Sequence, residues 1–178
     1  MTTYRPLEAH ELSRVAEIDR TERIDMLYVQ HGTRLEPVHG DFSASPWHEG
    51  DGEHSVAQQV EACEGLVAAG GTALGAFDGE RLVGIGVVVP HIREAVAQLA
   101  YLHVSDGFRG HGIGGRLTAE LERLALAAGD TRMVVSATPS ENTVRFYRGC
   151  GYEPLESPLP ELFELEPEDV HMEKRLGA

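Results

Sequence analysis

The segment Phe108–Leu117, FRGHGIGGRL, constrains the architecture most, because it places four glycines and two arginines between two regular elements. The run before it, AVAQLAYLHV at 95–104, predicts a buried strand, and the run after it, GRLTAELERLALAAG, predicts an amphipathic helix. A helix N-terminus offers unpaired N–H groups and the positive end of the helix dipole. Glycines let this backbone approach a ligand without interference from Cβ atoms. The segment therefore predicts a strand, an anion-binding loop suited to a pyrophosphate, and a helix.

Other interpretations of this loop stay open. The P-loop pattern GxxxxGK[ST] is absent from the segment. Gly110, Gly112 and Gly115 match the GxGxxG spacing of dinucleotide-binding domains. That pattern should open the first β-α unit, however, and the strand about 20 residues later, MVVSAT, carries no acidic residue. A nucleotide-dependent oxidoreductase and a purely structural turn are the alternatives to the phosphate site.

The remaining segments predict one α/β domain over residues 1–178. A helical pattern covers residues 7–30, a long loop follows at 31–54, and Ser55 is positioned to cap a helix that ends before Gly70. Asp78-Gly79 predicts a hairpin between two β-rich runs. Together with strands at the start and end of the chain and a helix at 140–151, the order is β-α-α-β-β-β-α-β-α-β-β. This order predicts a mixed sheet covered by helices.

Charge and composition restrict the partners and the location. The formal net charge of −14 disfavours nucleic acid, whose phosphates this surface repels. No apolar run approaches the roughly 20 residues of a membrane span, and the N-terminal segment has no secretory signal pattern. Cys63 and Cys150 are too few for a disulfide framework, so a cytoplasmic location is expected. The histidines of residues 31–54 lack metal-ligand spacing, and no metal is expected.

Two blocks in order resemble the GNAT superfamily of acyl-CoA-dependent N-acyltransferases. Arg109–Gly114 is similar to its R/Q-x-x-G-x-G/A signature, and ATPSENTVRFYRGCGYEPL is similar to its later Asn…FY…GF/GY block. The resemblance covers residues 72–176 well and residues 1–71 only as β-α-α. It implies a three-layer α/β fold with a mixed, mostly antiparallel sheet flanked by helices, and acetyl-CoA as the acyl donor.

The resemblance also implies site residues. Tyr147 would be the general acid, because a phenol of pKa about 10 can protonate a departing thiolate of pKa about 8.5. Arg109 would fix the glycine loop, whose N–H groups would bind the pyrophosphate, and the preceding strand would offer backbone groups to the pantetheine arm. The implied cofactor-binding residues are Leu102, His103, Val104, Arg109, Gly110, His111, Gly112, Ile113, Gly114, Gly115, Asn142 and Phe146.

Structural roles remain open for several of these residues. Asn142 also fits a helix N-terminus, the Phe146–Tyr147 pair also fits packing at a helix end, and the side chains of Leu102 and Val104 also fit the core.

The general base is not evident. Where the family often carries a carboxylate or histidine on the fourth strand, this chain has Gln98, and Ala100 stands two residues further on. Neither accepts a proton at neutral pH. Glu22, Asp25 and His103 are the candidate substitutes, and an acceptor amine of low pKa needs no base.

The sequence thus predicts an N-acetyltransferase that moves an acetyl group directly from acetyl-CoA to an unidentified amine. The acceptor is expected to be a small molecule or a peptide, with no nucleic acid or membrane partner, and the last strand offers an edge for a homodimer. The alternatives are a non-catalytic acyl-CoA sensor, motivated by the absent strand carboxylate, and the oxidoreductase named above.

Overall fold

The computed structural model describes residues 1–177 and contains a seven-stranded sheet with the order β1-β4-β5-β6-β7-β9-β8. Its strand pairs are antiparallel except for the parallel pair β6–β7. The strands of this sheet are β1 (Thr3–Pro6), β4 (Thr72–Asp78), β5 (Arg81–Arg93), β6 (Val96–Val104), β7 (Arg132–Ala137), β8 (Glu153–Pro154) and β9 (Val170–Arg175). The helices are the 3-10 helix η1 (Ala9–Glu17), α1 (Val56–Ala68), α2 (Ile113–Ala128), α3 (Glu141–Gly149) and α4 (Pro160–Leu165). A mixed, mostly antiparallel sheet flanked by helices is therefore confirmed.

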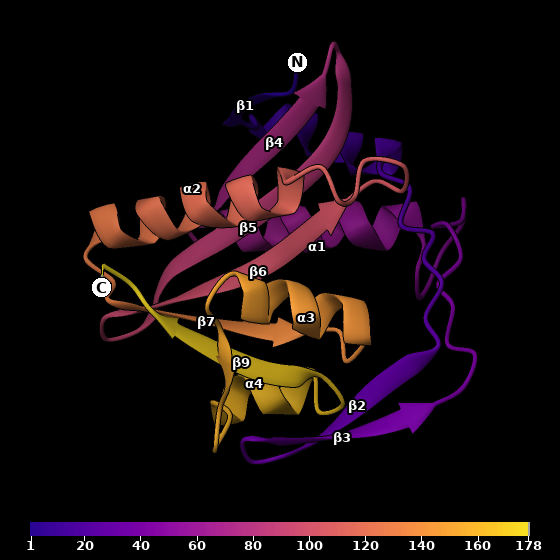
Figure 1. Ribbon diagram of the computed structural model, residues 1–178. Helices are drawn as coiled ribbons and strands as arrows, with labels where there is room; N and C mark the ends of the chain where they lie inside the picture. Colours follow the sequence, from indigo (N-terminus) through magenta and orange to yellow (C-terminus); the bar gives the residue numbers. More distant parts are fainter. Residues whose placement is uncertain (178) are drawn as a thin grey trace.

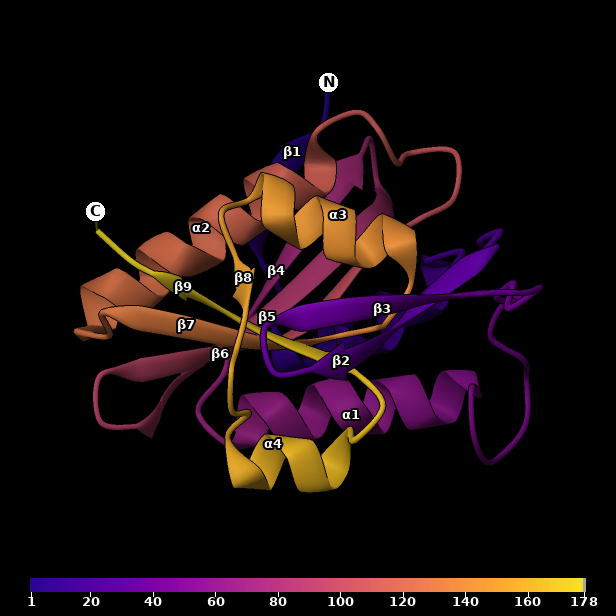
Figure 2. The same cartoon turned by 60° about the horizontal axis from the view of Figure 1, so that its bottom comes forward.

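The helices form two layers, one on each side of the sheet (Figures 1 and 2). Helices α2 and α3 cover one face, and α1 and α4 cover the other. Ile113, Leu117 and Leu121 follow one another at four-residue spacing and bury one stripe of α2 in the larger core cluster. Cys63 of α1 lies with η1 in a second cluster against the opposite face. No helix in these 177 residues is long and apolar enough to cross a membrane.

Two local predictions are confirmed by their backbone geometry. The Ser55 side chain accepts a hydrogen bond from Gln58 N at 3.1 Å and so caps α1. The β4–β5 hairpin turns at Gly79, whose φ of +60° is in the left-handed region that glycine tolerates.

The prediction of a helix through residue 30 is wrong. Only η1 is helical in that region, and residues 26–39 instead form a hairpin of β2 (Met26–His31) and β3 (Arg34–His39). Short apolar runs fit either period, so tertiary contacts decide between helix and strand. Tyr28 N donates to Pro139 O at 2.8 Å, and the Gln30 side chain bonds the backbone of the segment around β9.

Two further expectations change as a result. The loop expected at 31–54 is shortened, because β3 occupies its first part. Helix α4 was not predicted, since its six residues are too short for a periodic pattern.

Candidate active site

The site exists because two neighbouring strands separate. β6 and β7 pair only from Val96–Arg132 to Gln98–Val134, and their remaining residues diverge toward the carboxyl ends. A bulge places Ala100 out of register with β5, since Val87 pairs with Tyr101 and Val88 with Leu99. Between the strands lies a cleft of about 1580 Å³. Beyond Gln98, the edge of β6 that faces β7 has no strand partner in residues 1–177, so its backbone groups face the cleft.

The glycine loop forms one end of the cleft. Gly110 and Gly112 have φ values of +78° and +79°, and Gly112 is the N-cap of α2. A Cβ atom built at Gly110, Gly112 or Gly115 would meet no other atom within 4 Å, so this space is open to a ligand. Gly114 differs, because a Cβ there would lie 3.1 Å from the Phe146 ring. Three of these glycines therefore border open space, and the fourth permits helix α2 to pack against α3.

The Arg109 side chain connects the glycine loop to the N-terminal part of the chain through hydrogen bonds. Its Nε donates to Val104 O at 3.0 Å, and its Nη1 donates to Thr21 O at 2.7 Å. The loop is held a second time where Asp106 N donates to Asp19 O at 2.7 Å. Carbonyl oxygens accept both guanidinium bonds, and the Asp106 carboxylate lies 4.0 Å from Nη1, so the positive charge at the edge of the cleft is partly compensated.

Helix α3 contributes an aromatic side chain to the cleft wall. Tyr147 is 5% exposed and packs against Phe146 and Tyr152, with ring centroids 5.1 and 5.5 Å away. Burial raises the pKa of the Tyr147 hydroxyl, and the Cys150 thiol and the Asp169 carboxylate raise it further. The hydroxyl is therefore protonated at neutral pH.

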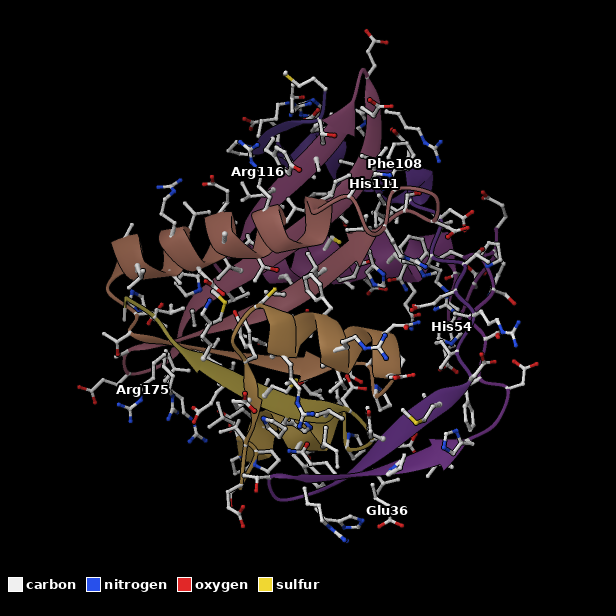
Figure 3. All side chains as sticks on the ribbon, in the orientation of Figure 1. Glu36, His54, Phe108, His111, Arg116 and Arg175 are labelled. Atoms are coloured by element: carbon white, nitrogen blue, oxygen red, sulfur yellow. The ribbon has the colours of Figure 1, made fainter. Side chains whose placement is uncertain are left out.

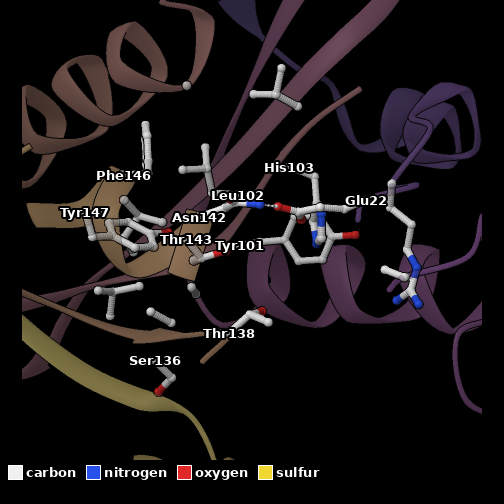
Figure 4. A pocket seen from close by; sticks show the side chains of 18 of the residues that line it. Glu22, Tyr101, Leu102, His103, Ser136, Thr138, Asn142, Thr143, Phe146 and Tyr147 are labelled. Carbon is white, nitrogen blue, oxygen red and sulfur yellow. Dashed lines mark hydrogen bonds between the residues drawn. The ribbon is translucent and has the colours of Figure 1, made fainter. Parts of the chain in front are cut away.

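Asn142 faces the N-terminal segment across the cleft. Its Nδ2 donates to Glu22 Oε1 at 2.9 Å, the contact drawn as a dashed line in Figure 4. The capping role is performed by Ser140 instead, whose Oγ accepts from Thr143 N at 3.2 Å. Helix capping therefore does not occupy Asn142, which lines the cleft.

The three candidate bases differ in position. Glu22 lines the cleft and accepts the Asn142 hydrogen bond, whereas Asp25 is paired with Arg23 at 3.1 Å and does not belong to the lining found within residues 1–177. His103 lines the cleft between Trp47 and Tyr101, with ring centroids 5.1 and 4.8 Å away. Burial, together with the charges of Arg20 and Arg109, lowers the pKa of His103 to about 4, so its ring is neutral at pH 7.

The cleft gathers nearly every residue that the sequence singled out (Figure 4). The β6 residues lie on one side and the α3 residues on the other. Of the predicted cofactor-binding residues, His111 alone is outside the lining; it is exposed on the loop before α2, and its Nδ1 lies 2.9 Å from Arg109 O (Figure 3). Over the described 177 residues, no three His, Cys, Asp or Glu side chains form a group that would hold a metal ion.

Sequence reasoning missed a third wall of the cleft. Leu162, Leu165, Glu166 and Asp169 reach it from α4 and the turn before β9. Pairing of Val170 with Ala137 brings this turn to the end of β7, where the cleft opens. The acidic run EPED before the last strand was the available signal, but no local pattern shows where such a turn will lie.

Comparison with known proteins places this architecture in a family. Residues 38–152 match the model of the Acetyltransferase (GNAT) family, which is more than half of the chain. No curated protein is similar enough in sequence to match.

Several solved structures share the fold over almost the whole chain. They include nourseothricin acetyltransferase (16% identity, TM-score 0.72, 98% of both chains). A putative streptothricin acetyltransferase from Bacillus anthracis in complex with acetyl coenzyme A matches at 16% identity and TM-score 0.70, over 97% of this chain and 96% of that one. A phosphinothricin acetyltransferase from Sinorhizobium meliloti in complex with acetyl-CoA matches at 16% identity and TM-score 0.63, over 99% and 89%. Together with the divergent β6–β7 pair and the glycine loop at its end, the family match shows that the chain belongs to the GNAT acetyltransferase family.

Proposed function

We propose that the chain transfers the acetyl group of acetyl-CoA directly to the nitrogen of a small-molecule or peptide amine. The observation that carries this proposal is a single cleft that joins an open glycine loop, an unpaired strand edge and a buried, protonated tyrosine. Each of these features serves one requirement of acyl transfer from a thioester. They lie along the divergence of two strands, so one extended donor molecule can contact all three.

The residues present fit the donor. The N–H groups from Gly110 to Gly115 bind the diphosphate, because the open space at three of these glycines admits it and the α2 dipole favours its charge. The free edge of β6 at Leu102 and Val104 hydrogen-bonds the pantetheine arm, and an N–H of this edge polarises the carbonyl. When bound, acetyl-CoA supplies the acyl group in activated form as a thioester.

Tyr147 donates a proton to the departing sulfur in this proposal. The raised pKa keeps its hydroxyl protonated, while the thiolate that leaves has an ordinary pKa of about 8.5. The phenol is then a weaker acid than the thiol, so transfer of its proton is uphill taken alone and is coupled to breaking of the carbon–sulfur bond, when negative charge develops on the sulfur.

The acceptor approaches the wall formed by α1 and the turn before β9, opposite the donor. Glu61, Glu166 and Asp169 line that side, so the field there attracts an amine in its cationic form. The similar structures are named for quite different acceptors, among them nourseothricin and phosphinothricin. We therefore propose an amine class for the acceptor and leave the individual compound open.

The test is a thiol-release assay with acetyl-CoA against a library of aliphatic, aromatic and peptide amines, preceded by calorimetry with acetyl-CoA alone. We expect micromolar binding, within the usual range for such substrates, and release of thiol with a subset of the amines. Absence of binding at millimolar acetyl-CoA would overturn the proposal. Binding without turnover of any amine would favour a sensor over an enzyme.

Arg109→Lys is expected to weaken acetyl-CoA binding about tenfold. A lysine ammonium cannot reproduce the two diverging guanidinium bonds to Val104 O and Thr21 O, so the glycine loop loses one of its attachments. The loss of one such charged hydrogen bond corresponds to about 1.5 kcal/mol. Calorimetry measures the change, and an equally large loss in Arg116→Lys would contradict it, because Arg116 instead stacks over Tyr4 with its Cζ 4.4 Å from the ring centroid.

A further inference from the structure

We propose that Asp169 is the catalytic residue that accepts the proton of the acceptor amine, and that the acceptor is an aliphatic amine bound as its ammonium form. This inference rests on the proposed acetyl transfer and names the base that the strand position Gln98 lacks. The turn before β9 positions this residue in the cleft.

Asp169 stands at the open end of the divergent strands. Val170, the next residue, pairs with Ala137, the last residue of β7. Ser136, Ala137 and Thr138 of this strand end line the cleft together with Asp169. The carboxylate is therefore fixed by sheet pairing beside the wall from which β6 diverges.

Tyr147 and Asp169 line the same cleft. The Asp169 charge is one of the causes that raise the pKa of Tyr147. Tyr147 belongs to the core cluster under α2 and α3. Along β7, the side chains of Val134 and Ser136 lie on the opposite face of the sheet, where α4 packs. A proton donor and a carboxylate thus meet at one cleft from two different elements, as a reaction that both takes and gives a proton requires.

The Asp169 carboxylate is available to a ligand. It is more than half buried, and no hydrogen bond or cation within the described residues lowers its pKa. It also lines a second cavity of about 430 Å³ between the β2–β3 hairpin and α4, so it is the residue shared by both spaces. Unpaired carboxylates in such positions cost free energy, and an ammonium group is the partner that offsets this cost.

The groups around Asp169 change the pKa of its carboxyl group. Burial, together with the Glu166 and Glu168 carboxylates on the same turn, raises the pKa of Asp169 to about 7. The other titratable or charged groups lining this cleft are Tyr101 and His103 of β6, Tyr147 of α3, Glu61 of α1, Asp106 and Arg109 of the glycine loop, and Arg20, Glu22 and Arg23 of the segment before β2. A carboxylate near pKa 7 is a far better proton acceptor for an ammonium group than one near 4.

In the proposed step, Asp169 Oδ takes one proton from the ammonium group. The nitrogen lone pair that becomes available forms the bond to the carbonyl carbon. As the carbon–sulfur bond breaks, Tyr147 gives its proton to the sulfur. The second proton leaving the nitrogen restores the Tyr147 hydroxyl through water, and Asp169 releases its own proton to solvent. The net products are the amide, the thiol and one proton.

The experiment compares two amines of similar shape and very different basicity, ethylamine and 2,2,2-trifluoroethylamine, in wild type and Asp169→Asn. We expect Asp169→Asn to slow acetylation of ethylamine about tenfold or more and that of the fluorinated amine much less, since the latter is already neutral at pH 7. In wild type, kcat/KM for ethylamine should rise with pH through about 7, as the carboxylate loses its proton. The variant should lack this rise.

Three controls separate catalysis from structure. Asp169→Glu should restore part of the ethylamine rate, because it returns a carboxylate. Glu168→Gln should keep the rate and move the pH midpoint downward, because it removes a charge that raises the Asp169 pKa. All variants should bind acetyl-CoA equally well. A wild-type protein that does not bind acetyl-CoA would contradict the proposed function rather than the role of Asp169.

Carbon-13 NMR of the aspartate carboxyl groups measures the pKa of Asp169 directly, whichever amine is the acceptor. The resonance missing in Asp169→Asn should titrate near pH 7 in wild type. Between about pH 4 and 7 the folded state then keeps a proton on Asp169 that the unfolded state has already released. The favourable contribution of Asp169 to the free energy of unfolding is therefore lost as pH rises through 7. Asp169→Asn should accordingly be at least as stable as wild type at pH 8. Titration near pH 4, or equal slowing of both amines, would overturn the inference.

Discussion

Replacement of Gly112 by valine is expected to lower the affinity for acetyl-CoA by about 100-fold or more, equal to about 2.7 kcal/mol. A Cβ at this position meets no protein atom within 4 Å, so the new side chain projects into the space proposed for the diphosphate. It also disfavours the backbone φ of +79°, which a β-branched residue rarely adopts. Isothermal calorimetry with acetyl-CoA measures the loss.

Gly107→Val is the matched control for this change. Gly107 has the same φ of +79° and equally open space around its Cβ position, but it lies outside the cleft lining. The backbone strain of roughly 1–2 kcal/mol should lower the melting temperature of both variants by about 5 °C. Only Gly112→Val should lose the ligand. If both variants lose affinity equally, loop strain rather than obstruction is the cause, and the proposed cradle is wrong.

Tyr147→Phe is expected to reduce kcat about 100-fold with little change in KM for acetyl-CoA. Its hydroxyl is the group proposed to protonate the sulfur, and general acids contribute roughly 10²–10⁴-fold to such reactions. Phenylalanine preserves the ring contacts with Phe146 and Tyr152, so the cleft keeps its shape. Steady-state kinetics from pH 6 to 9 provides the measurement. Because burial raises the Tyr147 pKa, wild type should show no alkaline loss from this group in that range.

Tyr152→Phe provides the comparison for this second change. Tyr152 is fully buried, and its hydroxyl donates to Met133 Sδ at 3.0 Å, outside the cleft. Removing it should cost stability while kcat stays near the wild-type value. A Tyr147→Phe enzyme as active as Tyr152→Phe at every pH would eliminate Tyr147 as the acid.

The sequence determined the parts of this protein that depend on local chemistry. The glycine loop was evident at Gly110–Gly115, because glycines beside arginine between a predicted strand and a predicted helix are a local pattern. The Ser55 cap and the Gly79 turn were equally local, because each depends on the conformation of a few adjacent residues. Membership of the family was also visible from two motifs in order, and the family match covers both.

Only the tertiary structure decided how these local segments are arranged around the cleft. The run at Met26–His31 pairs with β3 in a local hairpin, but Pro139 and the backbone near β9, more than 100 residues away in the chain, also hydrogen-bond to it. Asp169 is unremarkable in an acidic chain until the pairing of Val170 with Ala137 carries it to the mouth of the cleft. Local propensity fixes turns, caps and loops, whereas the divergence of β6 from β7 and the residues that face it depend on long-range pairing, which no short segment encodes.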